Sequence, residues 1–195
     1  MFNKLRRKVF SYHVNQFKKK VVREKQYVDY AHTKSVLVLY ESELSENRTF
    51  ITEVMRTLTA DGKRVSVYGF VPKKVGISSS MNGFNMLDIN SLNFFYKPSN
   101  QLLQLLEEDH FDLAIDLTSS FCQPLQYLLL HVNATCKVGG SIGDFDLVDV
   151  AVNMPQTELV DEDDKKDVSV QLLYEREKAL WHEILHYLKS IVAAK

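Results

Sequence analysis

Three short apolar runs constrain the fold of this 195-residue chain more than any other feature of its sequence. They are SVLVLY at 35–40, RVSVYGFV at 64–71 and FDLAIDL at 111–117. A short run that is apolar along its whole length, as 35–40 is, is typical of a strand buried on both faces. Such strands belong to parallel sheets that helices cover on both sides, so the sequence predicts an α/β protein.

Helical patterns separate these strands along the chain. An apolar helical face spans 50–58 and ends at Asp61-Gly62, and further helices are expected after Pro98, over 122–132 and over 169–192. Weaker strands are expected near 86–88, within a long loop at 75–92, and at 94–96, 136–139 and 147–154. The sequence therefore predicts a Rossmann-like, doubly wound and mainly parallel sheet of five or six strands, with 111–117 in its centre.

The composition and the cysteines limit the class of protein. Hydrophobic residues make up 45% of the chain and charged residues 25%, which is ordinary for a globular protein. Cys122 and Cys136 are too few for a disulfide framework, and no signal-peptide pattern opens the chain. The apolar runs are far shorter than the roughly 18 residues of a membrane span. We therefore expect a cytoplasmic protein, at most peripheral to the inner membrane.

The charge is unevenly distributed along the chain. Residues 1–25 hold nine basic side chains and one acidic one, a formal charge of +8, so the other 170 residues carry −9. Such asymmetry indicates an anionic partner for the N-terminal segment. The basic residues predicted to bind this partner are Lys4, Arg6, Arg7, Lys8, Lys18, Lys19, Lys20, Arg23 and Lys25.

The same segment has a helical repeat of apolar residues. Phe2, Leu5, Val9, Tyr12, His13 and Phe17 advance by three or four residues and are expected to share one helix face. In one interpretation this face packs on the body and the lysines are solvated. In the others the helix lies on an anionic membrane or binds RNA, for example in the ribosome. These three interpretations remain open from the sequence.

The chain is expected to consist of two parts. Residues 1–30 form a basic amphipathic N-terminal helix or arm, and residues 31–195 form a single Rossmann-like α/β domain. An acidic stretch at 158–167 (ELVDEDDKKD) is a linker or loop ahead of the long C-terminal helix.

Several of these segments carry a resemblance to a known family. They are SVLVLY, GKRVSVYGFV at 62–71, NFFYKPS at 93–99, FDLAIDL, CKVGG at 136–140 and LHYLK at 185–189. Together with the lysine-rich first helix, they resemble a family of uncharacterised Bacteroidota proteins, a domain of unknown function. The resemblance spans nearly the whole chain and implies no activity.

Residues 111–140 carry a narrower resemblance. This segment, from FDLAIDL to CKVGG, is similar to part of the acceptor-side half of heptosyltransferase-type glycosyltransferases. Those enzymes have a Gly-Asp turn after their first strand, where this chain has Glu41-Ser42-Glu43, and they need a second domain for the nucleotide sugar. The resemblance therefore implies a common fold and not glycosyl transfer.

A literal HExxH motif stands at 182–186. Two histidines four residues apart can bind zinc from one helix face, with the glutamate activating water. Here, however, Leu180, Trp181 and Ile184 mark the buried side of the helix, and both histidines are expected to point away from it. We therefore expect a coincidence on a solvated face, with no metal and no catalytic residue.

A ligand site in such a fold lies at the carboxyl ends of the strands. The loop after the first strand is acidic, so it would repel the phosphates of a dinucleotide. Hydroxyl groups and glycines follow the fourth and fifth strands, where a small-molecule pocket is possible. The residues predicted to line it are Asp116, Thr118, Ser119, Ser120, Gly139, Gly140 and Ser141. The alternative is that the hydroxyls cap a helix and the glycines form a turn.

The sequence thus favours a non-enzymatic binding or adaptor protein without a cofactor, tethered to an anionic membrane or to RNA by residues 1–25. The alternative is a small-molecule-binding protein or an enzyme with a glycosyltransferase-like fold that acts on a phosphorylated or sugar-like metabolite.

Overall fold

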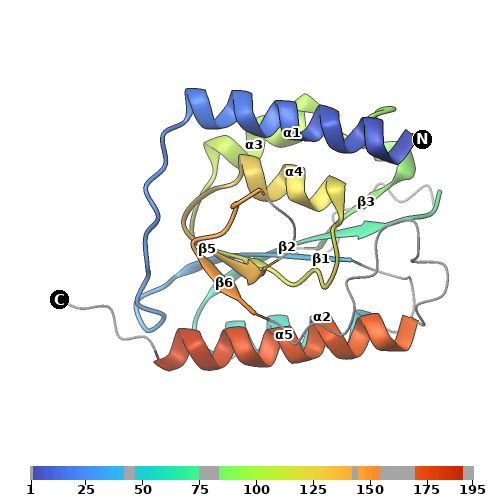
Figure 1. The fold of residues 1–195 in the computed structure, drawn as a ribbon. Helices are drawn as coiled ribbons and strands as arrows, with labels where there is room; N and C mark the ends of the chain where they lie inside the picture. Colours follow the sequence, from blue (N-terminus) through green and yellow to red (C-terminus); the bar gives the residue numbers. More distant parts are fainter. Residues whose placement is uncertain (1, 42–46, 75–83, 142–144, 154–169, 191–195) are drawn as a thin grey trace.

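The computed structural model describes residues 2–41, 47–74, 84–141, 145–153 and 170–190, and these contain one six-stranded sheet (Figure 1). Its strands are β1 (Ser35–Glu41), β2 (Arg64–Val71), β3 (Phe84–Asp88), β4 (His110–Asp116), β5 (Asn133–Gly140) and β6 (Val150–Val152). The helices of this part of the chain are α1 (Phe2–Lys20), α2 (Asn47–Ala60), α3 (Asn100–Glu108), α4 (Gln123–His131) and α5 (Val170–Ser190), with a short 3-10 turn at Ile89–Ser91.

The sheet has the strand order β3-β2-β1-β4-β5-β6, and every neighbouring pair is parallel. The chain builds outward from β1 to β3, returns to place β4 against the other edge of β1, and then builds outward to β6. Val36 of β1 is level with Val65 of β2 and Leu113 of β4. This is the doubly wound, Rossmann-like arrangement, so the predicted fold class and the central position of 111–117 are confirmed.

Helices cover both faces of the sheet. Figure 1 shows α1, α3 and α4 on one face and α2 and α5 on the other. Val36 and Val38 belong to the core under α2 and α5, whereas Leu37 and Leu39 belong to the core under α1 and α4. Successive side chains of a strand point to opposite faces of the sheet, and both faces of β1 are buried from solvent. This explains why 36–40 is apolar at every position.

Some predicted elements differ from the structure. Residues 94–96 form a turn and not a strand, because the Asn93 side chain accepts hydrogen bonds from the backbone N–H groups of Phe95 (2.9 Å) and Lys97 (3.0 Å). Tyr96 in this turn has a φ of 57°. Within the described residues 147–153, the strand predicted at 147–154 is limited to β6, and the one predicted at 136–139 is the longer β5. The acidic stretch 158–167 lies outside the described residues.

Candidate functional site around the N-terminal helix

Helix α1 is part of the hydrophobic core. Phe10 is fully buried and Val14 is 3% exposed, and both belong to the core on the face of the sheet that α1, α3 and α4 cover. The Phe10 ring meets the rings of Tyr127, Phe145 and Phe121 edge-on at centroid distances of 4.7, 4.9 and 5.8 Å. Aromatic pairs at these distances and angles are favourable beyond the area they bury. The inner face of α1 therefore holds it on the body.

The face of α1 predicted to be apolar was only partly correct. Phe17 packs against the core and His13 lies 2.8 Å from the Tyr127 hydroxyl, but other members of the stripe are exposed. Leu5 and Tyr12, which the predicted stripe includes, are 47% and 61% exposed, and the stripe leaves out the most buried residues, Phe10 and Val14. The side chain of Phe2 lies outside the described part of the chain. The helix carries apolar residues on two faces, and the face chosen from the sequence was rotated away from the one that packs on α4.

Five of the nine basic residues of the N-terminal segment make contacts with the body. Arg6 donates to the Phe94 carbonyl at 3.1 Å and lies 3.9 Å from the centre of the Tyr96 ring, and Arg7 lies 5.2 Å from the Phe121 ring. The other contacts are those of Lys18 with the carbonyls of Phe145 and Asp146, of Arg23 with Asp149 and of Lys25 with Asp146. These residues dock the segment on the domain.

Arg23 makes the most extensive of these contacts. Its guanidinium forms a two-pronged ion pair with Asp149, whose side chain is 1% exposed, and it also donates to the carbonyls of Ala134 (3.0 Å) and Thr135 (2.8 Å). Asp149 accepts a further hydrogen bond from the backbone N–H of Lys137 at 2.7 Å. The segment after α1 is therefore fastened to β5 and to the residues that lead into β6.

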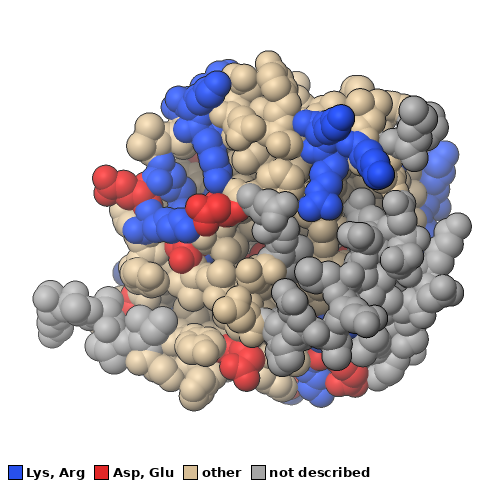
Figure 2. All heavy atoms as spheres, viewed as in Figure 1, with Lys and Arg blue, Asp and Glu red and all other residues tan. Residues whose placement is uncertain are grey.

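The remaining four basic residues face solvent. Lys4, Lys8, Lys19 and Lys20 are exposed, and the described part of the chain offers none of them a hydrogen bond or an ion pair. On a helical projection Lys8 and Lys19 lie on the side opposite Phe10, as Leu5 and Tyr12 do. In Figure 2 lysine and arginine side chains gather toward both ends of α1, with uncharged atoms between them. The outer face of α1 thus combines cations with exposed apolar groups.

The segment that follows α1 continues this pattern. Val22 is 90% exposed and Tyr27 is 64% exposed, and both stand within or next to the basic stretch 18–25. Single exposed apolar residues are ordinary on a protein surface, but here several stand beside unpaired lysines. We refer to Lys4, Leu5, Lys8, Tyr12, Lys19, Lys20 and Val22 as the outer basic surface.

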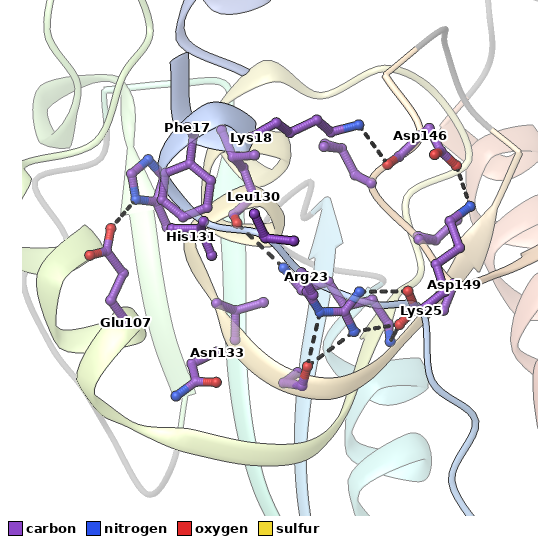
Figure 3. A pocket seen from close by; sticks show the side chains of 17 residues that line it. Phe17, Lys18, Arg23, Lys25, Glu107, Leu130, His131, Asn133, Asp146 and Asp149 are labelled. Atoms are coloured by element: carbon purple, nitrogen blue, oxygen red, sulfur yellow. Dashed lines mark hydrogen bonds and ion pairs between the residues drawn. The ribbon is translucent and has the colours of Figure 1, made fainter. Parts of the chain in front are cut away.

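A pocket lies beside the same segment (Figure 3), and the exposed Val22 belongs both to its lining and to the outer basic surface. The pocket has a volume of about 710 Å³. It is formed by the ends of α1, α3 and α4, by Val21, Val22, Arg23 and Lys25, by the start of β5 and by residues 146–149. In Figure 3, Lys25 points to Asp146, Arg23 to Asp149, and His131 to Glu107. The three acidic side chains of the wall are thus engaged by basic partners.

Two basic groups of the pocket wall make no ion pair within the described residues, Lys18 and Lys137. Lys137 is 4% exposed, and its Nζ donates to the carbonyl oxygens of Leu129 (2.6 Å) and Leu130 (3.3 Å) at the end of α4. Sequence reasoning missed this lysine. The signal that could have found it is a lone lysine inside the otherwise small and apolar strand ATCKVGG.

The carboxyl end of β4, which with the end of β5 was predicted to form a ligand pocket, holds a buried polar cluster. Asp116 is buried and accepts hydrogen bonds from the backbone N–H (3.0 Å) and hydroxyl (2.7 Å) of Thr118 and from the Gln126 amide (2.8 Å). Burial raises the pKa of Asp116, and the bonds from Thr118 and Gln126 oppose that rise. The buried carboxylate of Asp116 therefore has its hydrogen-bond donors, Thr118 and Gln126, inside the core.

The other residues predicted for that pocket lie nearby. Gly139 packs directly on Asp116, since a Cβ at this position would stand 2.9 Å from the Asp116 Cβ. Gly140 is buried, Ser141 is exposed and its backbone N–H donates to Val152, and Ser119 and Ser120 are half-buried. The small-molecule pocket at this edge stays a prediction, and the glycine at 139 is explained by strand packing.

The HExxH face and the cysteines also have clear positions. His182, Glu183 and His186 are exposed on α5, while Trp181 and Ile184 are buried, so the predicted direction of this face is confirmed. In the described part of the chain, histidine, cysteine and acidic residues form no cluster suited to a metal ion.

Cys122 and Cys136 are buried, and burial raises the pKa of the Cys136 thiol to about 11.

A family model described as a family of unknown function (DUF6913) matches residues 6–163. The chain belongs to this family. No curated protein and no solved structure matches it. The comparisons give no evidence for the likeness of residues 111–140 to heptosyltransferase-type enzymes or for an origin in Bacteroidota. The match begins within α1, so most of α1 and the basic segment after it belong to the sequence that the DUF6913 family shares.

Proposed function

We propose that this member of the DUF6913 family is a non-enzymatic binding protein that docks on anionic membranes through its outer basic surface. The observation that supports the proposal is that four exposed lysines, which make no ion pair within the described residues, stand beside the exposed Leu5, Tyr12 and Val22 on α1 and just beyond it. The inner face of α1 is occupied by the core, which leaves the outer face free for a partner. No helix of the described residues could span a bilayer.

Charge complementarity favours a lipid surface. Each lysine close to an anionic bilayer contributes about 1 kcal/mol of attraction, so the four exposed lysines together provide roughly 4 kcal/mol. This attraction is screened over about 8 Å at physiological ionic strength. Apolar side chains at the interface add a contribution that salt does not remove. RNA would be held chiefly by phosphate contacts and would make little use of Leu5 and Val22.

Three variants of the full chain test this proposal. The first replaces Lys4, Lys8, Lys19 and Lys20 by Gln. The second replaces Leu5, Tyr12 and Val22 by Ser. The matched control replaces four exposed cations away from α1 by Gln, namely Lys34, Arg56, Arg64 and Lys74. Each protein is sedimented with phosphatidylcholine vesicles that contain or lack phosphatidylglycerol, and circular dichroism checks that it is folded.

The proposal predicts binding only to the vesicles that contain phosphatidylglycerol, with loss of binding in the first two variants and not in the control. If the control loses as much binding as the lysine variant, the attraction is unspecific and the proposed surface is wrong. If the protein binds RNA instead, and only the lysine variant loses that binding, the partner is nucleic acid and the membrane proposal fails.

A further inference from the structure

Lys137 has an unusual environment for a lysine. It sits within β5 with its side chain between the sheet and the end of α4, is 4% exposed, and contributes to the wall of the 710 Å³ pocket. A lysine is rarely buried unless an acidic partner accompanies it. Within the described residues, no carboxylate contacts its Nζ, because Asp149 is engaged by Arg23.

The hydrogen bonds of Lys137 suit a neutral amine. A neutral amine has two N–H donors and one lone pair, whereas an ammonium group has three donors. The carbonyls of Leu129 and Leu130 accept two hydrogen bonds from Nζ, and the described residues supply no third acceptor. The nearby Arg23 guanidinium also disfavours a second positive charge. Burial, with a smaller contribution from Arg23 that the carboxylate of Asp149 opposes, lowers the pKa of Lys137 to about 7.

The geometry points to Lys137 as a nucleophilic amine that forms an imine with a small, negatively charged aldehyde or ketone bound in the pocket. In this reaction the Nζ lone pair adds to the carbonyl carbon, and the carbonyl oxygen leaves as water with both amine protons. Lys18 at the wall, which makes no ion pair within the described residues, favours an anionic compound, whereas Arg23 and Lys25 are already paired with Asp149 and Asp146. The reaction needs no oxidant or reductant.

Lys63 provides a matched control within the same chain. It is 5% exposed, and its Nζ also donates to two carbonyls, those of Tyr30 (2.7 Å) and Thr33 (3.0 Å). Burial lowers its pKa as well. Its Nζ, however, lies 4.1 Å from the centre of the Tyr30 ring, and Lys63 is not among the residues that line the pocket. The two lysines thus differ chiefly in that Lys137 lines this pocket and Lys63 does not.

The experiment uses the folded, full-length protein and pyridoxal 5′-phosphate, an anionic aldehyde, as the probe. The imine is trapped with borohydride at several pH values, and peptide mass spectrometry measures the occupancy of each lysine. An exposed lysine at neutral pH is neutral in only about one molecule in 3,000, so its labelling rises about tenfold per pH unit. The labelling of Lys137 is expected to level off above about pH 7.

At neutral pH we expect Lys137 to be labelled at least about tenfold more than Lys63 and more than the exposed lysines. The variant Lys137→Arg, which keeps the donors at the end of α4, is expected to lose that adduct alone. Labelling of Lys137 no greater than that of Lys63 in the unaltered protein would overturn the inference, whether or not the variant folds. Labelling that appears only in denaturant would overturn it as well.

Discussion

Replacing Phe10 by Ala tests whether α1 is part of the core. Phe10 is fully buried, and its ring lies against the three aromatic rings of Tyr127, Phe145 and Phe121. Truncating a buried phenylalanine to alanine costs about 3–5 kcal/mol, since the transfer free energy is lost and a cavity is left. In a chain of this size that corresponds to a drop in Tm of roughly 6–20 °C. Urea unfolding followed by circular dichroism measures the change.

The control for this prediction is Tyr12→Ala on the same helix. Tyr12 is 61% exposed, so its removal is expected to change the free energy of unfolding by less than about 0.5 kcal/mol. The reasoning would be refuted by a loss of less than about 1 kcal/mol in Phe10→Ala, or by equal losses in the two variants. Either result would mean that α1 does not pack on α4 through Phe10 and Val14.

Two further predictions concern the contacts that dock α1 and the segment after it. Arg23→Gln leaves the buried carboxylate of Asp149 without its counter-charge, so we expect a loss of about 3–5 kcal/mol in urea unfolding; a loss below about 1 kcal/mol would contradict the proposed anchor. Burial lowers the pKa of His13, beside the Tyr127 hydroxyl, and of His131, beside Glu107. Because their folded-state pKa lies below the unfolded value of about 6.5, these histidines contribute fully to the free energy of unfolding above that pH. Their contribution is lost as the pH falls through the folded-state pKa. We expect a flatter profile between about pH 7 and pH 5 after replacement of both histidines by Gln, and an unchanged slope would contradict this assignment.

The sheet was predictable from the sequence because its signals are local. Residues 36–40 are apolar at every position because β1 is covered on both faces, and the same burial makes 111–117 a clear central strand. The strand predicted at 94–96 failed for a local reason of a different kind. Three aromatic residues favour a strand, but the Asn93 side chain binds two backbone N–H groups and closes a turn there.

The orientation of α1 could not be predicted with the same success. Leu5 and Tyr12 on one side and Phe10 and Val14 on the other give the helix two apolar faces. Periodicity identifies the helix, but it does not determine which face finds complementary rings on α4. Only the packed arrangement of Tyr127 and neighbouring aromatic residues makes that choice.

The roles of the candidate-site residues likewise depend on tertiary contacts that the sequence does not reveal. The basic character of 1–25 was evident from the sequence, yet the division into docking cations such as Arg23 and free cations such as Lys19 depends on where Asp149 lies in the fold. Lys137 acquires its environment from the end of α4 and from Arg23, which lies 114 positions earlier in the chain. Contacts between such distant residues leave no local pattern.

The most direct test of the account places a fluorescent reporter on the outer face of α1. Cys122 and Cys136 are buried, so a fluorophore sensitive to polarity can be attached selectively to a cysteine introduced as Tyr12→Cys. The control is Tyr187→Cys on α5, a site 47% exposed on the other side of the sheet (Figure 1). On adding vesicles that contain phosphatidylglycerol, the account predicts a blue shift and brighter emission at residue 12 and no change at residue 187. No change at residue 12, or equal changes at both sites, would contradict it.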